Sequence, residues 1–196
     1  MRRLRRAELP ADTVALARAL IGSVVVRELR GERLAGRIVE TEAYPVGDAA
    51  AHAFIGETAR NRSLFLRRGH AYVYFCYGCW YMLNVSSEGA GVGAGVLVRA
   101  LEPLTGVDTM RRLRGTPRVR DLARGPGRAA QALGIDRRQD GLDLCAPGPL
   151  WLATNGAAPG PIASSVRIGL TREAHRVLRF YERGNPHVSG SAALRR

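Results

Sequence analysis

The spacing of apolar and polar residues changes several times along the chain. After Asp12, a residue type that commonly caps helices, apolar residues recur at helical spacing as far as Gly22, which predicts a helix over this stretch. Val24–Val26 and Leu34–Tyr44 are rich in apolar and β-branched residues on either side of a turn at Gly31. They predict two strands around that turn.

A second strand-rich region follows a polar stretch. Residues Ala49–Gly69 are polar and lack periodicity, so we expect irregular structure there. Tyr72–Val85 is rich in aromatic and β-branched residues with Gly78 in its middle, which predicts a hairpin or a bulged pair of strands. Val96–Leu101 predicts another strand after a glycine-rich turn.

The C-terminal half mixes both patterns. Val107–Leu113 and Pro126–Leu133 predict helices, the second with proline in its first turn. Val166–Leu170 and Leu178–Tyr181 predict short strands, and the Pro/Gly-rich stretch Ala146–Pro161 is expected to be a long loop.

The order of these elements predicts one α+β domain over residues 1–196, built on a largely antiparallel sheet. The sequence shows no internal repeat and no clear linker. We expect the basic residues 1–8 to form a flexible arm and residues 190–196 to form a flexible tail.

Composition narrows the class of partner. The chain carries 30 Lys+Arg and 17 Asp+Glu, a formal net charge of +13, and every one of these cations is arginine. Such an excess favours a polyanionic partner, nucleic acid before a membrane surface. The absence of lysine from the sequence excludes a lysine Schiff base and a Walker-A phosphate site.

The sequence also leads us to expect that a membrane span, a disulfide framework and a metal site are absent. No apolar run approaches the ~20 residues of a membrane span, so we expect no membrane partner. Three cysteines make no disulfide framework, which favours a reducing cytoplasm. Cys76 and Cys79 match C-x-x-C but follow an aromatic strand, and the four histidines are scattered. We therefore expect these cysteines to be structural, and we predict no metal and no cofactor.

Aromatic residues concentrate in one part of the chain. A plain core built from one hairpin and a platform that stacks on an unpaired base are both open interpretations. Alternation places Tyr72 and Tyr74 on one face, and Phe75 and Tyr77 on the other, so both faces cannot be equally buried unless the segment is covered twice. The nine clustered aromatics are Tyr44, Phe54, Phe65, Tyr72, Tyr74, Phe75, Tyr77, Trp80 and Tyr81.

Charged residues inside apolar strands are the second unusual feature. Glu40 and Glu42 lie two apart in a β-branched strand, so both side chains point to one face. Arg99 is a charge inside the apolar run Val96–Leu101. A buried carboxylate needs a cation or hydrogen-bond donors, and pairing Arg99 with one of these glutamates would supply them. The pair is either a structural ion pair or a general base that an arginine orients.

Taken in order, these and other motifs resemble the alkyladenine (3-methyladenine) DNA glycosylases. The resemblance spans about residues 8–190, and several long motifs in the right order make it specific. The matching segments are Arg37–Tyr44, Ala51-His52, Arg60–Arg62, Tyr72–Tyr74, Tyr77-Gly78, Asn84–Ser87, Leu97–Pro103, Gly125-Pro126, Arg167–Gly169 and Arg179–Tyr181.

The resemblance implies a monofunctional enzyme of base excision repair. Such an enzyme flips an alkylated or deaminated purine nucleotide out of duplex DNA and hydrolyses its N-glycosidic bond, leaving an abasic site. By the matching motifs, Glu42 would be the general base that activates water. Arg99 would hold that water and the carboxylate, and the backbone carbonyl of Ile168 would be a third water ligand.

The same motifs imply how DNA is bound. Tyr44, His52 and Tyr74 would sandwich and hydrogen-bond the flipped base. Asn84 would lie where the exocyclic amino group of guanine would clash. Tyr77 would fill the gap left in the duplex.

The family fold implied is a compact α+β domain around a curved antiparallel sheet, with a protruding β-hairpin that enters the minor groove. We expect Arg60 and Arg62 to contact the DNA. We also expect a monomer in the cytoplasm, associated with the nucleoid if the organism is bacterial.

Two segments depart from the family pattern. The loop within residues 45–51 is about one residue shorter, and the turn within residues 88–95 is longer and richer in glycine. Both border the expected pocket, so they bear on which lesions are accepted among 3-methyladenine, 7-methylguanine, hypoxanthine and ethenoadenine.

Two rival classes use some of the same residues. A nucleic-acid-binding protein without catalysis would share the charge and the aromatics, but it has no need of a carboxylate at Glu42, which repels phosphates. A metal-dependent nuclease would use Glu40, Glu42 and Glu102.

Overall fold

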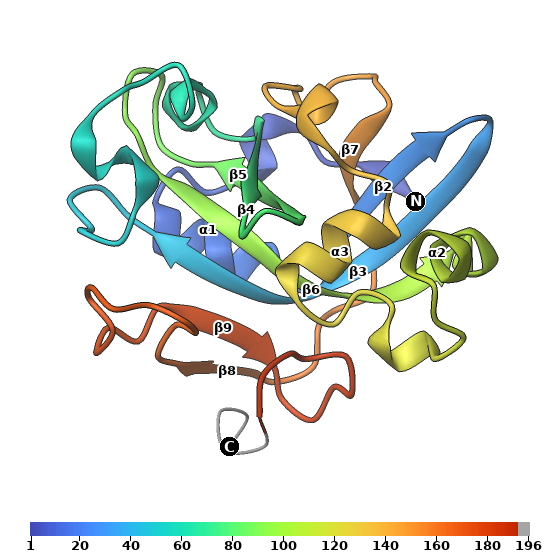
Figure 1. Cartoon of the computed structure of the whole chain (residues 1–196). Coiled ribbons are helices and arrows are strands. Elements are labelled where there is room, and N and C mark those ends of the chain that lie inside the picture. The colour runs from blue at the N-terminus through green and yellow to red at the C-terminus, as the bar shows by residue number, and fades with distance from the viewer. Residues whose placement is uncertain (192–196) are drawn as a thin grey trace.

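Within residues 1–191, the part of the chain that the computed structural model describes, nine strands form one antiparallel sheet (Figure 1). The strands are β1 (Arg2–Arg3), β2 (Val24–Leu29), β3 (Glu32–Tyr44), β4 (Ala71–Cys76), β5 (Trp80–Ser86), β6 (Gly95–Thr105), β7 (Leu150–Thr154), β8 (Ile162–Ser165) and β9 (Arg179–Glu182). Their order is β1-β7-β2-β3-β6-β5-β4, with β9 paired to β3 and to β8. The predicted α+β domain with a largely antiparallel sheet is confirmed.

Three α-helices in this part of the chain pack on the sheet: α1 (Thr13–Ala19), α2 (Val107–Arg114) and α3 (Pro126–Ala132). As predicted, α1 is capped by Asp12, whose carboxylate accepts the N–H of Ala15 at 2.7 Å. Helix α1 packs against β3, and α3 packs against β5 and β6. The largest apolar cluster includes Leu16 of α1, Val98 of β6 and Ala130 of α3, so helices and sheet share one main core.

The long strand β3 changes its neighbour halfway along. Glu32–Arg37 pair with β2, Glu40–Glu42 pair with β9, and β6 runs along the opposite edge. Register shifts on both sides of Glu40 interrupt the ladder with β6. Such bulges bend a strand and re-aim its side chains. Here they lie where the strand carries its two carboxylates.

The predicted hairpin between Tyr72 and Val85 is formed by β4 and β5. Cys76 lies opposite Trp80, so the turn consists of residues 77–79. Figure 1 shows the hairpin lying over the middle of the sheet.

Two predictions for the C-terminal half are wrong. The expected loop Ala146–Pro161 contains β7, whose apolar residues are buried between β1 and β2, and the prolines and glycines around it concealed this strand. The expected strand Val166–Leu170 is a loop, and the strand lies earlier, at β8. This loop leaves the sheet where the Arg167 side chain turns inward to the buried carboxylate of Asp48, at 2.5 Å.

The N-terminal residues do not lie apart from the domain, as a flexible arm would. β1 pairs with β7, and the N–H of Leu4 donates to the carbonyl of Leu152 at 2.9 Å. Of the expected tail, residues 192–196 lie outside the described residues, while Arg124 donates to the carbonyl of Gly190 at 3.4 Å. Among residues 1–191, no helix has the length and apolar character needed to cross a bilayer.

Candidate active site

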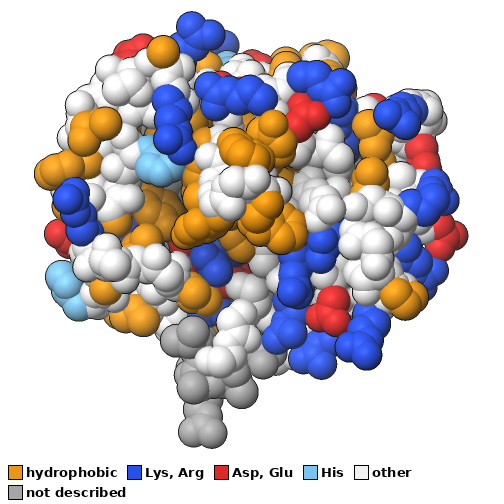
Figure 2. Space-filling model, viewed as in Figure 1, with side chains coloured by type: hydrophobic (Ala, Val, Ile, Leu, Met, Phe, Trp, Pro, Cys, Tyr) orange, Lys and Arg blue, Asp and Glu red, His pale blue; other side chains and the backbone are white. Residues whose placement is uncertain are grey.

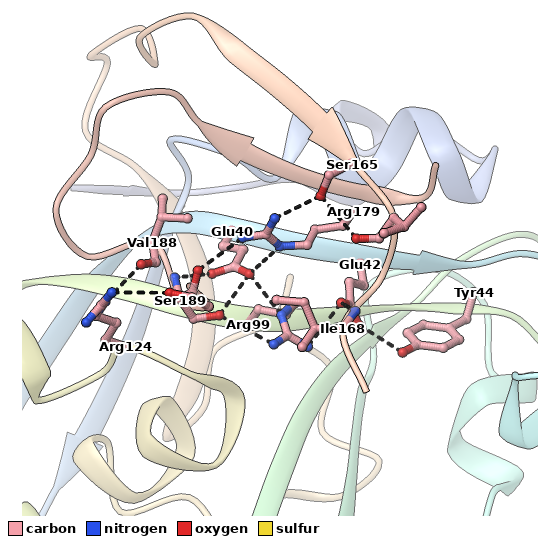
Figure 3. Close-up of polar contacts among 12 residues, drawn as sticks. Glu40, Glu42, Tyr44, Arg99, Arg124, Ser165, Ile168, Arg179, Val188 and Ser189 are labelled. Carbon is pink, nitrogen blue, oxygen red and sulfur yellow. Dashed lines mark hydrogen bonds and ion pairs between the residues drawn. The ribbon is translucent and has the colours of Figure 1, made fainter. Parts of the chain in front are cut away.

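Two fully buried carboxylates flank one arginine at the bulged part of β3 (Figure 3). Arg99, on the neighbouring β6, donates through Nε to Glu40 Oε1 at 2.9 Å, and its Nη1 lies 3.1 Å from Glu42 Oε1. Sequence reasoning expected Arg99 to pair with one glutamate, and the structure shows that it bridges both.

Glu42 receives two further donors. The hydroxyl of Tyr44 donates to Oε2 at 2.9 Å, and the backbone N–H of Ile168 donates to Oε1 at 2.8 Å. Tyr44 reaches the carboxylate because residues two apart on a strand share a face. Three donors, one of them cationic, therefore fix the position of the buried carboxylate. The contact of Ile168 with Glu42 is made by its N–H, and the predicted role of its carbonyl as a water ligand stays a prediction.

Glu40 accepts further hydrogen bonds from groups in the C-terminal part of the chain. Arg179 Nε donates to it at 2.7 Å, and Ser189 donates through its backbone N–H at 2.6 Å and its hydroxyl at 2.9 Å. Burial opposes the charge of this carboxylate, but Arg99 and Arg179 together hold the pKa of Glu40 below its ordinary value. Glu40 therefore anchors Arg99 from the side away from Glu42.

A cavity of about 160 Å³ opens next to Tyr44. This is several times the ~30 Å³ that one water molecule occupies, so it has room for a small ring system. Five of the predicted substrate-binding and DNA-binding residues line it together: Tyr44, His52, Tyr74, Tyr77 and Asn84. The carboxylate of Glu42 does not line the cavity itself; it lies behind the hydroxyl of Tyr44.

The aromatic rings on one side of the cavity touch each other. His52 and Tyr74 meet edge to face with ring centroids 4.5 Å apart, and Tyr72 stacks on Tyr74 at 5.3 Å. Two rings that sandwich a base lie about 7 Å apart, twice the optimal contact distance. A base therefore does not fit between His52 and Tyr74 as they stand.

Tyr72 is a site residue that the predicted set lacked. It lines the cavity, and its hydroxyl lies 2.9 Å from His52 Nδ1, which fixes the imidazole ring. The alternation that placed Tyr72 on the same face as Tyr74 was the signal for it. Across the hairpin, Asn84 Nδ2 donates to the carbonyl of Tyr72 at 3.2 Å, so the amide is held at the cavity wall.

Three titrating groups of the cavity, Tyr44, Tyr74 and His52, are held in their neutral forms. Burial, followed by the charge of Glu42, raises the pKa of Tyr44 well above its ordinary value, and burial raises that of Tyr74. Desolvation by the neighbouring rings and the charge of Arg60 lower the pKa of His52. Near neutral pH the cavity thus presents phenols and a neutral imidazole.

The hairpin tip presents an exposed aromatic ring. Tyr77 is 79% exposed and has a φ of 53°, a left-handed conformation that bulky residues rarely adopt. Beside the tip, Arg60 donates to the carbonyl of Phe75 at 3.2 Å, and the side chain of Arg62 is exposed. Figure 2 shows hydrophobic side chains gathered in the middle of this face with arginines around them, next to a hollow.

Both segments that we expect to depart from the family pattern border the cavity. Ala50 and Ala51 line it from the loop within residues 45–51, and Ala94 and Gly95 line it from the glycine-rich turn. Each contributes backbone or a small side chain, so the length of these loops shapes the cavity wall.

The remaining candidate groups do not gather into a site. Cys76, Cys79 and Cys145 are free thiols. Among residues 1–191, no three His, Cys, Asp or Glu side chains lie close enough together to hold a metal ion.

Comparison with known proteins gives a consistent picture. The family model for methylpurine-DNA glycosylases matches residues 7–186. A protein of Mesorhizobium japonicum named as a 3-methyladenine DNA glycosylase is 64% identical over 191 residues, which cover 97% of this chain and 92% of that protein. The DNA-3-methyladenine glycosylase of Mus musculus is 45% identical over 195 residues, which cover 90% of this chain and 58% of the mouse protein.

Proposed function

Because the chain belongs to the methylpurine-DNA glycosylase family, and is thus a DNA glycosylase that removes alkylated bases in base excision repair, we propose that Glu42 drives its chemistry. The substrate is a damaged purine nucleotide flipped out of duplex DNA. The reaction is hydrolysis of its N-glycosidic bond. The observation that carries this proposal is the geometry of Glu42, which is oriented by three donors immediately behind the cavity wall.

Flipping is the first step, and the exposed hairpin tip supports it. Flipping costs a few kcal/mol, least for a damaged base. Insertion of Tyr77 into the gap fills the space that the base leaves, as wedges do in other minor-groove proteins. Stacking of the base in the cavity, at ~1–3 kcal/mol per base, offsets the remaining cost. Arg60 and Arg62 bind phosphates near the tip.

Base selection takes place in the cavity. The base lies between Tyr44 and the His52–Tyr74 pair, where neutral aromatic rings offer stacking faces. Asn84, held by the carbonyl of Tyr72, occupies the position where the exocyclic amino group of guanine would fall. The normal base is then excluded by a clash and an unpaired polar group.

Bond cleavage follows from the charge of Glu42. As the C1′–N bond breaks, the electron pair leaves with the base and the sugar becomes oxocarbenium-like, which a nearby carboxylate stabilises. Glu42 accepts a proton from water as the water oxygen bonds to C1′, giving the abasic site. Arg99 and the carbonyl of Ile168 hold that water. Because the chain has no lysine, no lysine amine competes as a nucleophile.

The proposal also covers the range of lesions, the oligomeric state and the location of the protein. We propose that alkylated purines and deaminated purines such as hypoxanthine both enter the cavity, because its wall is aromatic and neutral. We propose a monomer, since one chain supplies all the site residues named here, and a cytoplasmic location, which suits three free thiols.

A direct assay tests the proposed substrate class. The protein is incubated with duplexes that carry a single 3-methyladenine, hypoxanthine or ethenoadenine, and alkali-labile strand breaks report base loss. We expect release of at least one alkylated or deaminated purine and none of normal guanine. Release of normal guanine as fast as any damaged purine would refute the proposed selection by Asn84.

A further inference from the structure

A buried cation lies against the aromatic ring that forms one wall of the cavity. The guanidinium carbon of Arg167 is 4.6 Å from the centroid of the Tyr44 ring. Its side chain is fully buried, donates to both carboxylate oxygens of Asp48 at 2.5 and 3.1 Å, and donates to the carbonyl of Ala43 at 3.1 Å. Among the described residues, its Nε finds no hydrogen-bond partner. The guanidinium is therefore held against the ring as well as by its polar bonds.

The two faces of the Tyr44 ring have different neighbours. Arg167 covers one face and is absent from the cavity wall, which Tyr44 itself lines. The face turned to the cavity is therefore the other one. The charged groups near the ring include Glu42 at its hydroxyl, Arg99, which lies 3.1 Å from that carboxylate, and Asp48 beyond Arg167, which Arg176 also approaches at 3.4 Å.

The cation on one face of the Tyr44 ring changes what the opposite face, which is turned to the cavity, can bind. A cation over an aromatic ring is attracted by the negative charge density of the π system. When one cation already draws on that density, a second cation on the opposite face gains less and is repelled by the first. A neutral purine, which stacks by dispersion and dipole contacts, is not penalised in this way.

We propose that Arg167 is a specificity-determining residue, which acts through Tyr44 to weaken the binding of cationic alkylpurines relative to neutral lesions. The inference rests on the proposed function, in which the damaged base stacks on Tyr44. It gives the contact between the Arg167 guanidinium and the Tyr44 ring a role beyond structure. Cationic lesions already have a good leaving group, so a site that favours neutral bases broadens the range of lesions removed.

Competition between two lesions in one tube tests the inference. Duplexes with 3-methyladenine, a cationic lesion without the exocyclic amino group of guanine, and hypoxanthine, a neutral base, carry different dyes, and the ratio of their initial release rates gives the ratio of kcat/KM. Because both substrates meet the same enzyme molecules, a variant that folds poorly lowers both rates and leaves the ratio unchanged. Arg167→Gln removes the cation, Asp48→Asn removes its counter-charge, and Arg27→Gln is the control, a buried arginine bonded to backbone carbonyls and absent from the cavity wall.

The two variants should move the ratio in opposite directions. We expect Arg167→Gln to raise the ratio of 3-methyladenine to hypoxanthine release roughly tenfold. Asp48→Asn leaves the charge of Arg167 less compensated and should lower the ratio, and Arg27→Gln should not change it. Equal losses for both lesions in Arg167→Gln and Asp48→Asn mean a structural role only and overturn the inference. Release of neither base by the wild-type protein would refute the proposed lesion range itself. This result is obtained from the wild-type protein alone, so it is distinguished from a failure of the inference about Arg167.

Discussion

Replacing Glu40 by glutamine should destabilise the fold as well as slow the reaction. The carboxylate is fully buried and accepts hydrogen bonds from Arg99, Arg179 and Ser189. Glutamine keeps the size of the side chain but leaves two buried guanidinium groups without their shared counter-charge. Removing one partner of a buried ion pair costs about 3–5 kcal/mol. We expect the free energy of unfolding of Glu40→Gln to fall by about that amount.

Urea-induced unfolding measures this loss, and a surface pair supplies the control. Glu28→Gln breaks the bond from Arg33 Nε, 2.7 Å long, between side chains that are 37% and 56% exposed, so it should cost about 1 kcal/mol or less. The folded-state pKa of Glu40 is depressed, so its stabilising contribution is fully present above the unfolded value of about 4.3 and is lost as the pH falls through the folded pKa. The difference between wild type and Glu40→Gln should therefore be constant from about pH 6 to 8 and shrink below about pH 4. Equal losses for the two variants at neutral pH would show that Glu40 is not the anchor of Arg99.

Three further perturbations address DNA binding and chemistry. Tyr77→Ala should change the free energy of unfolding by no more than about 0.5 kcal/mol from the wild-type value, because the ring is exposed. It should weaken flipping, which is measured by the fluorescence of 2-aminopurine beside the lesion. An unchanged flipping equilibrium argues against the wedge. Arg60→Ala and Arg62→Ala should each lower the slope of log Kd against log salt by about 1, and slopes equal to that of wild type mean that neither arginine binds a phosphate. Base release should be unaffected by EDTA, whereas complete loss would support the metal-dependent nuclease.

The local pattern of the sequence predicted most of the elements but not those whose environment is set by distant residues. Helix α1 and the β4–β5 hairpin follow from capping, periodicity and turn chemistry, which are local. Strand β7 was missed because Pro and Gly surround a short apolar run that only the neighbouring strands stabilise. Strand β8 was placed too late, because Val166–Leu170 looks extended but is drawn out of the sheet by the bond between Arg167 and Asp48.

The candidate site likewise contains residues that the local sequence predicted and groups that only the folded chain brings together. A charge inside an apolar strand is a local anomaly, so Glu40, Glu42 and Arg99 could be grouped from the sequence. The donors that complete the group could not be found in this way: Ser189 lies 149 positions from Glu40, and Ile168 lies 126 positions from Glu42. Backbone N–H groups leave no trace in residue type, and only the folded chain shows which of them reach a carboxylate.

Substitution of Glu42 by glutamine tests the proposed chemistry most directly. The variant is compared with wild type in two measurements on the same lesion duplex, the dissociation constant and the single-turnover rate of base release. Glutamine preserves the size of the side chain behind the cavity wall but cannot accept the proton from water. Binding should therefore stay within about threefold, while release slows by about 10²–10⁴-fold, the range for loss of a general base. Release at the wild-type rate, with binding intact, would contradict the assignment of Glu42 as the base.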